Sequence, residues 1–498
     1  MAFSHVSAGE QKQGFLLMTS STKKTKTDFF WILFGTAGQN ALQFISLVVL
    51  ARLLSPEDFG IVAAAMIVVG LTNIFSQLGI GPAVVQKKEL TKSDIGTAKT
   101  LSALIGLVVF ALVFASAELL QSLMNVDGLA EIIRLLSFVL IVSGLTVVGQ
   151  SLLQRHFEFK KYIVCIFVSQ AVSSLGTAIP LAMLGFGFYS LVYASLVQSL
   201  TLLMLVSFLT KRYGGWSFNL TSTKQLANYG FGQSLGKICN YFAGQGDNFV
   251  VVRQMGVVDL GFYSRAYSLV LIPANLVGGV LDKISFPIMA RKQDDNSSLA
   301  EMFVLSNSII AMLTVPMAVF IMVSSDLIVD LLFGRNWSEV APILSILVSI
   351  LFFRTAYKVS DSLSKAKGSV YKRAWRQAIF ALAVFCFSYI GSFYGVEGVA
   401  YGVAAAIILN YVLMLHLSKS LVNFAYKDII ELLIKYTIVF FVVTATIHLI
   451  KKHLFGFVIL DLIILAFATL VVSLLCYYIM KFWFKAEVMF LKKNLVGK

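Results

Sequence analysis

Continuous apolar stretches of about 20 residues recur along the whole chain, and they limit its fold more than any other feature. A helix of that length crosses the hydrocarbon core of a bilayer. Of the 498 residues, 58% are hydrophobic and 13% are charged, whereas about a quarter of a soluble domain is charged. An outer-membrane barrel is excluded, because its strands alternate polar and apolar residues over about ten positions. The sequence therefore predicts an all-α polytopic membrane protein.

We count fourteen candidate membrane spans, and no segment between them is long enough to form a soluble domain. The seventh is diluted by five glycines between positions 230 and 246. The approximate cores of the spans are residues 29–51, 61–80, 98–117, 132–153, 163–184, 188–209, 226–252, 260–284, 303–323, 340–363, 375–393, 396–418, 433–450 and 456–482.

The basic residues predict the orientation of these spans. The chain carries 40 Lys and Arg against 25 Asp and Glu, a net charge of +15. With the N-terminus placed in the cytoplasm, 29 of the basic residues fall in cytoplasmic tails and loops and 6 in outer loops. Such a bias is typical of membrane topology, so the positive charge does not indicate nucleic acid. Residues 1–27 lack the apolar stretch of a signal peptide, and we expect both termini to be cytoplasmic.

An internal repeat joins the two halves of the chain at an offset of 201 residues. Arg52, Asp58 and Gly60 in the first outer loop match Arg253, Asp259 and Gly261 after the seventh span. The spans before these loops carry matching polar stripes at helical spacing, which are Thr36, Gln39, Gln43 and Ser46 in the first copy and Lys237, Asn240, Gly244 and Asp247 in the second.

Because six spans separate equivalent positions, both copies cross the membrane in the same direction. The predicted architecture is a cytoplasmic N-tail, two pseudo-symmetric six-helix lobes, a C-terminal helix pair and a cytoplasmic C-tail. Their limits are 1–27, 28–212 (spans 1–6), 213–420 (spans 7–12), 421–482 (spans 13–14) and 483–498. Parallel repeats are common in alternating-access carriers, which bind substrate between their lobes near the membrane midplane. The alternative is that the duplication is only ancestral and carries no information about transport.

Two segments resemble signatures of a transporter family. They are residues 51–60 (ARLLSPEDFG) followed by 79–87 (GIGPAVVQK), and residues 260–267 (LGFYSRAY) followed by Phe286-Pro287 and 290–294 (ARKQD). Both resemble polysaccharide flippases of the Wzx branch of the multidrug/oligosaccharidyl-lipid/polysaccharide exporter superfamily, especially the colanic-acid and teichuronic-acid exporters. The resemblance implies translocation of an undecaprenyl-diphosphate-linked oligosaccharide across the bacterial plasma membrane, for O-antigen, capsule or exopolysaccharide synthesis. The implied partners are this substrate, membrane lipids and polysaccharide polymerase or export proteins, without nucleic acid.

Polar and ionisable residues within spans are the candidate substrate-binding residues, because exposing one Lys, Arg or Asp to lipid costs about 2.5–3.5 kcal/mol or more. Lys237, Asn240 and Asp247 lie on the second stripe, and Gln39 and Gln43 lie on the first. Lys237 and Asp247 are ten residues apart, about 15 Å along a helix, so they do not pair directly. The alternatives are a structural ion pair with another partner, or a lysine that extends to the interface.

A second series, Arg354, Lys358, Asp361 and Lys365, falls on one face of the tenth span. It could guide an anionic head group, or it could be an ordinary basic helix end with a Lys358–Asp361 pair. Arg265 is a further candidate. Tyr263 and Tyr267 flank it and indicate either sugar stacking or, more commonly, the aromatic belt of the interface.

The repeated outer-loop residues Arg52, Asp58, Arg253 and Asp259 suit either phosphate contact or a structural or gating role. Duplication favours the structural role, because a folding element is copied with its lobe.

No enzyme motif, nucleotide-binding loop, metal-ligand cluster or cofactor signature is found in the sequence, and the four cysteines and five histidines are dispersed. We therefore expect no enzyme activity, cofactor or metal, and an energy source other than ATP. Two alternatives stay open. A cation-coupled drug or metabolite exporter is disfavoured because the first span has no Asp or Glu. A membrane-embedded glycan polymerase is disfavoured because the loops are short.

Overall fold

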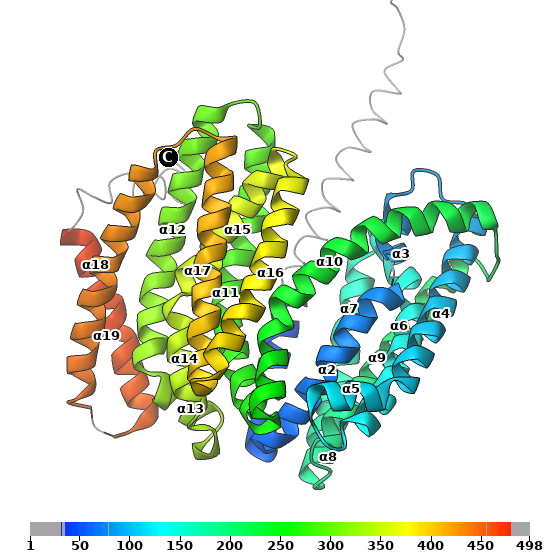
Figure 1. Ribbon diagram of the computed structural model, residues 1–498, viewed down its shortest axis with the longest axis horizontal. Helices are drawn as coiled ribbons and strands as arrows, with labels where there is room; N and C mark the ends of the chain where they lie inside the picture. Colours follow the sequence, from blue (N-terminus) through cyan, green and yellow to red (C-terminus); the bar gives the residue numbers. More distant parts are fainter. Residues whose placement is uncertain (1–30, 32–34, 78, 455, 480–498) are drawn as a thin grey trace, which may run out of the picture. The chain divides into compact units, whose positions relative to one another are not determined.

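The structure is a computed structural model that describes residues 31, 35–77, 79–454 and 456–479 (Figure 1). The described residues form helices joined by short loops, without a strand among them. Ten helices in this part of the chain are long and apolar enough to cross a membrane. The number is eleven if α14 (Val340–Ser349) and α15 (Leu351–Ala366), which meet at 45°, form one bent span. The prediction of an all-α polytopic membrane protein is confirmed.

The predicted count of fourteen spans is not confirmed. The first predicted span begins outside the described residues, although residues 35–53 are helical. The seventh and eighth predicted spans correspond to α10 (Leu220–Met255) and α11 (Val257–Arg291), which do not belong to the ten apolar helices. Lys237, Asp247 and several glycines dilute the hydrophobicity of α10, so its length alone does not mark it as a span.

The chain divides into two compact units, and the division falls within α10. Unit 1 comprises residues 1–54, 68–120 and 128–235, and unit 2 comprises 55–67, 121–127 and 236–498. The predicted lobe limits, between residues 212 and 213 and between 420 and 421, stay predictions. The predicted tails, residues 1–27 and 483–498, lie outside the described residues.

In unit 1, α4 and α6 approach each other closely because glycines face backbone at their crossing. A Cβ placed on Gly106 would lie 2.9 Å from the Leu140 carbonyl oxygen, and one on Gly144 would lie 2.4 Å from that of Ser102. Small residues allow such backbone approach between membrane helices. Besides residues 35–53 and parts of α2 (Pro56–Gln77), α5 (Ala117–Met124) and α10, unit 1 contains α3 (Ile80–Gln86), α4 (Lys92–Ala115), α6 (Leu129–Arg155), α7 (Phe159–Ser173), the π-helical η1 (Ser174–Ala178), α8 (Ile179–Met183), α9 (Tyr189–Thr210) and the 3₁₀ turn η2 (Lys211–Tyr213).

Unit 2 is built around a large apolar core that includes the fully buried Phe303 and the nearly buried Tyr411. The C-terminal helices α18 and α19 lie beside α12 within this unit (Figure 1). Tyr477 fastens α19 there, because its hydroxyl donates to the Met312 carbonyl at 3.0 Å. The remaining elements of unit 2 are α12 (Asn296–Val323), α13 (Ser325–Leu332), the 3₁₀ turn η3 (Arg335–Trp337), α16 (Val370–Ser392), α17 (Gly395–Leu421), α18 (Tyr426–Lys451) and α19 (Val458–Ile479).

Candidate functional site

A buried carboxylate on α10 is the centre of the polar interior of unit 2. Asp247 is only 1% exposed, and its Oδ2 accepts a hydrogen bond from the hydroxyl of Tyr263 on α11 at 2.8 Å. Its Oδ1 accepts from the backbone N–H of Asn248 at 2.9 Å. A buried ionisable group is costly unless it is hydrogen-bonded, and these two donors meet that requirement. Tyr263 is itself fully buried, so its interpretation as an interface-belt residue is wrong.

A second tyrosine connects this carboxylate with a cation on α15. The rings of Tyr263 and Tyr267 lie 6.0 Å apart, and the Arg354 guanidinium carbon stands 4.3 Å from the centroid of the Tyr267 ring. The contact is a cation–π interaction, which strengthens when water is excluded. Together, α10, α11 and α15 place a carboxylate, two phenols and a half-buried guanidinium in one polar line. Such an arrangement can bind a charged group, and the binding would change the interactions between the carboxylate and the guanidinium.

The polar stripe of α10 leads from this line to exposed positions. Lys237 and Asn240 are exposed, and a Cβ placed on Gly244 would meet no atom within 4 Å. Of the matching stripe in the first copy, Gln39 is half-buried and Gln43 is exposed. Lys237 and Asp247 therefore differ in environment, and the stripe offers an exposed cation at one end and a buried carboxylate at the other.

The basic series on α15 is only partly as expected. Asp361 is buried and forms ion pairs with Lys365, at 2.7 Å, and with Arg373 of α16. The expected Lys358–Asp361 pair is therefore wrong, because the i,i+4 lysine and a neighbouring helix satisfy the carboxylate instead. The side chain of Lys358 lies against Gly278 of α11. Within this series, Arg354 contacts Tyr267 of the tyrosine line.

Arg265 is held in an aromatic cluster within unit 2. Its guanidinium carbon lies 4.6 Å from the Phe59 ring centroid, and Phe59 packs edge-on against the buried Trp337 at 5.5 Å. Its Nε is buried without a hydrogen-bond partner among the described residues. A guanidinium with spare donors suits an anion. Arg265 thus contacts Phe59, whereas Arg354 contacts Tyr267.

The repeated outer loops meet in a reciprocal helix crossing. A Cβ on Gly60 of α2 would lie 1.7 Å from the Val257 carbonyl oxygen, and one on Gly261 of α11 would lie 2.0 Å from that of Pro56. Pro56 and Val257 differ by the same offset of 201 residues as the two glycines, so the contact is symmetric between the copies. Only glycine allows two backbones to come this close. This crossing is why residues 55–67 belong to unit 2.

Two of the charged residues of these loops, Asp58 and Arg253, form hydrogen bonds within unit 2. Asp58 accepts from the backbone N–H and the hydroxyl of Ser55, at 2.9 and 2.7 Å, and so caps the start of α2. Arg253 donates to the Ser122 carbonyl oxygen at 2.9 Å. Arg52 is exposed and Asp259 is half-buried. These contacts are compatible with a structural role, and that role stays a prediction.

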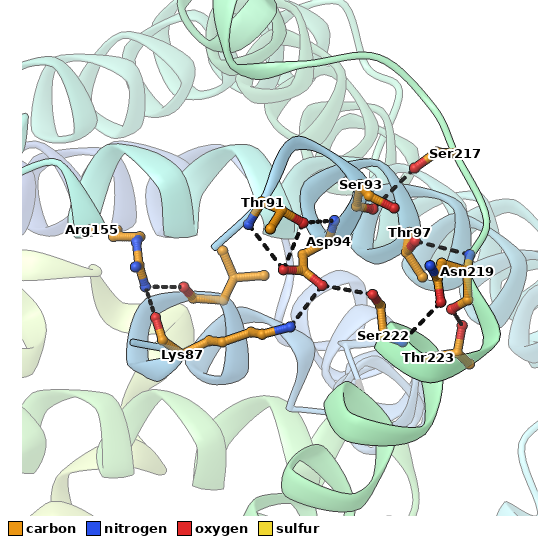
Figure 2. Close-up of polar contacts among 11 residues, drawn as sticks. Lys87, Thr91, Ser93, Asp94, Thr97, Arg155, Ser217, Asn219, Ser222 and Thr223 are labelled. Carbon is orange, nitrogen blue, oxygen red and sulfur yellow. Dashed lines mark hydrogen bonds and ion pairs between the residues drawn. The ribbon is translucent and has the colours of Figure 1, made fainter. Parts of the chain in front are cut away.

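A polar network in unit 1, which the sequence analysis missed, surrounds Asp94 at the start of α4 (Figure 2). Asp94 is nearly buried, pairs with Lys87 at 2.7 Å and accepts from Ser222 at 2.6 Å. With Thr91 it forms a reciprocal capping box. Arg155 donates to the last carbonyls of α3, including that of Lys87 at 2.6 Å. The spacing of Thr91 and Asp94 is the signal that could have revealed this network.

Comparison with known proteins places residues 49–342 in a family model described as polysaccharide biosynthesis protein. The chain is 26% identical over 404 residues to the lipopolysaccharide biosynthesis protein WzxC of Escherichia coli, covering 79% of this chain and 80% of that protein. It is 22% identical over 413 residues to the teichuronic acid biosynthesis protein TuaB of Bacillus subtilis, covering 80% and 85%. Its fold matches the lipid II flippase MurJ in an inward closed conformation, with a TM-score of 0.75, 16% identity and 91% and 99% coverage.

The glycine crossing predicts opposite effects of the same substitution at two positions of α11. Gly261→Ala forces a Cβ against the Pro56 carbonyl, and we expect it to destabilise the protein by about 1–3 kcal/mol. Gly279→Ala is the matched control, because its Cβ would meet no atom within 4 Å. There alanine should be neutral or stabilise the helix by up to about 1 kcal/mol. Thermal unfolding of the detergent-solubilised protein measures both, and equal shifts would contradict the crossing.

Proposed function

The chain belongs to the family of polysaccharide biosynthesis proteins, and from this membership we propose that it flips a lipid-linked oligosaccharide across the bacterial plasma membrane. The observation that carries the proposal is the family match over residues 49–342, together with relatives named for lipopolysaccharide and teichuronic acid synthesis. The proposed substrate is an undecaprenyl-diphosphate-linked repeat unit of an O-antigen, capsule or exopolysaccharide. The protein acts as a transporter and not as an enzyme.

The proposed orientation places both termini in the cytoplasm. It is supported by the distribution of basic residues, 29 in the loops and tails of one side against 6 in those of the other. Substrate would then enter from the side that carries the basic loops, where an anionic diphosphate is attracted before it enters the membrane.

The physical requirement for flipping is a wet, polar route for the head group. About 30 Å of hydrocarbon is prohibitive for a diphosphate and several sugars unless polar groups replace their water. The stripe of α10 supplies an exposed lysine, an exposed asparagine and the uncovered Gly244. Lys237 is proposed to contact the diphosphate, and Asn240 is proposed to contact the sugars. Gln39 and Gln43 supply equivalent amides on the first copy.

Arg354 is proposed as a second anion contact that is controlled by Asp247. The Arg354 guanidinium stacks on Tyr267, next to Tyr263, which is hydrogen-bonded to Asp247. A bound anion would therefore compete with the Asp247 carboxylate for the positive charge of Arg354. Lys358 would support the anion from the same helix face, and Arg265 would offer its unpartnered Nε to the diphosphate. Binding of an anion to Arg354 would change the charge balance around Asp247, and this change could couple substrate binding to a change of conformation.

The Gly60–Gly261 crossing is proposed as a part that separates during alternating access. It joins equivalent positions of the two repeats, next to the repeated loop residues Arg52, Asp58, Arg253 and Asp259. A carrier that is open to the cytoplasm must be closed on the outer side. A glycine crossing can provide this closure, because it lets two helix backbones touch without large side chains between them. Release of the substrate would then require the starts of α2 and α11 to part.

Deletion of the gene in its native host tests the function directly. We expect intact lipid-linked repeat units to accumulate facing the cytoplasm and surface polysaccharide to disappear, because polymerisation needs the units on the outer face. Complementation by the unaltered gene is the control. Normal polysaccharide together with hypersensitivity to cationic drugs would instead support the drug-exporter alternative.

Lys237→Ala tests the proposed diphosphate contact. Loss of a hydrogen bond from a charged group costs about 1.5–3 kcal/mol, so we expect flipping of a lipid-linked oligosaccharide by the purified protein in liposomes to fall about tenfold to a hundredfold at low substrate. The matched control is Lys292→Ala, which removes an exposed lysine beyond the end of α11. Equal flipping by both variants at equal protein amounts would remove Lys237 from the site.

A further inference from the structure

The connector between α9 and α10 has two edges of opposite character. Two apolar side chains of the connector are strongly exposed, Trp216 at 62% and Phe218 at 58%, and so is Leu220, the first residue of α10, at 77%. Ser217 between the two aromatic residues is half-buried and faces α4, and Asn219, although exposed, contacts α4 through its backbone N–H. An alternating pattern with one bonded edge and one apolar edge is typical of an extended segment that lies between two different environments.

The polar edge is fastened to α4 by hydrogen bonds (Figure 2). The Ser217 hydroxyl donates to the Ser93 carbonyl oxygen at 3.0 Å, and the Thr100 hydroxyl donates to the Ser217 carbonyl oxygen at 2.9 Å. The backbone N–H of Asn219 donates to the hydroxyl of Thr97 at 3.1 Å. These bonds fix which way each residue of the connector points.

Three further contacts tighten the attachment. Lys99 donates to the Gly214 carbonyl oxygen at 2.7 Å, and Ser222 donates to Asp94 at 2.6 Å. A Cβ on Gly96 would lie 2.3 Å from the Ser217 hydroxyl oxygen, so the connector rests directly on the backbone of α4. Because the segment is bonded at both ends and in its middle, Trp216 and Phe218 cannot turn inward without breaking these bonds.

The α4 residues to which the connector is bonded indicate how deep its exposed apolar edge lies in the membrane. The bonded residues run from Ser93 to Thr100, which is about 10 Å of helix from the start of the apolar helix Lys92–Ala115. The first two turns of a spanning helix lie where head groups meet hydrocarbon. Trp and other aromatic residues are enriched at this level, because their rings tolerate both environments.

The charges beside the connector fit an anionic lipid surface. Lys88, Lys92, Lys211 and Arg212 are exposed at this end of unit 1. Arg212 also pairs with Glu158, and Lys161 donates to the same carboxylate at 3.2 Å. Burial raises the pKa of the Glu158 carboxyl, but these bonds outweigh it and hold the pKa below its ordinary value. Glu158 therefore stays ionised and pairs with Arg212 and Lys161, and the exposed Lys88, Lys92 and Lys211 give the surface around the connector its basic character.

We propose that residues 216–220 dock in the head-group region of the cytoplasmic leaflet, with Trp216, Phe218 and Leu220 against the upper acyl chains and the nearby basic residues against anionic head groups. The connector would thus be held between α4 and the lipid. It would keep the junction between α9 and α10 at a constant depth in the membrane. This inference concerns lipid attachment and does not depend on which substrate the protein carries.

Spin labels test the proposal in the full chain in liposomes of phosphatidylethanolamine and phosphatidylglycerol. The four cysteines are first replaced by alanine, and a single cysteine is then introduced at 216, 218 or 220. Labels at 216 and 218 should collide mainly with oxygen, which concentrates in lipid, and little with a water-soluble nickel chelate. Leu220→Cys is informative because it leaves both aromatic rings in place. Asp294→Cys, in the exposed turn after α11, is the aqueous control and should show the reverse preference.

Two results would overturn the proposal. Labels at 216, 218 and 220 as accessible to the nickel chelate as the label at 294 would place the edge in water. Labels shielded from both reagents would place it against protein. Neither result involves transport, so failure of this inference is distinguishable from failure of the proposed flippase function.

Discussion

The cost of placing charged groups in hydrocarbon determines what the rest of this structure can be. Each ionisable side chain within the helices must be paired, hydrogen-bonded or in contact with water. Asp247 meets this condition through Tyr263, and Asp361 meets it through Lys365 and Arg373. Lys237 is exposed on α10, and the account requires that water surrounds it. The contrast between satisfied interior groups and an exposed cation is the basis of the proposed head-group route.

The helical class, the repeat and the family could all be predicted from the sequence, because each depends on local patterns. Apolar runs identify helices that cross a membrane, and an offset of 201 residues identifies equivalent loops. The structure gives the repeat a physical meaning, because Gly60 and Gly261 are the residues at which two equivalent helices cross. The sequence could not reveal that contact, since nothing in a local pattern states which backbone a glycine faces.

The errors have a common cause, which is that burial and pairing depend on residues distant in the chain. Tyr263 suited an interface belt by sequence, yet it is fully buried and its hydroxyl donates a hydrogen bond to Asp247 of α10. Asp361 had a lysine three residues before it, yet it pairs with Lys365 and with Arg373 on the next helix. The predicted count of fourteen spans is not confirmed, which is a different outcome. Polar residues and glycines make α10 less apolar, so hydropathy alone does not identify it as a membrane span.

The most direct test of the account is the environment of positions 36 and 237, which are equivalent in the two repeats. Single cysteines there, in a cysteine-free protein in liposomes, should react with a charged, water-soluble maleimide. A cysteine at Leu112, which is exposed on the apolar helix α4, should react only with a lipophilic reagent. If positions 36 and 237 behaved like position 112, acyl chains would cover the stripes. The proposed hydrated route for a charged head group would then be contradicted.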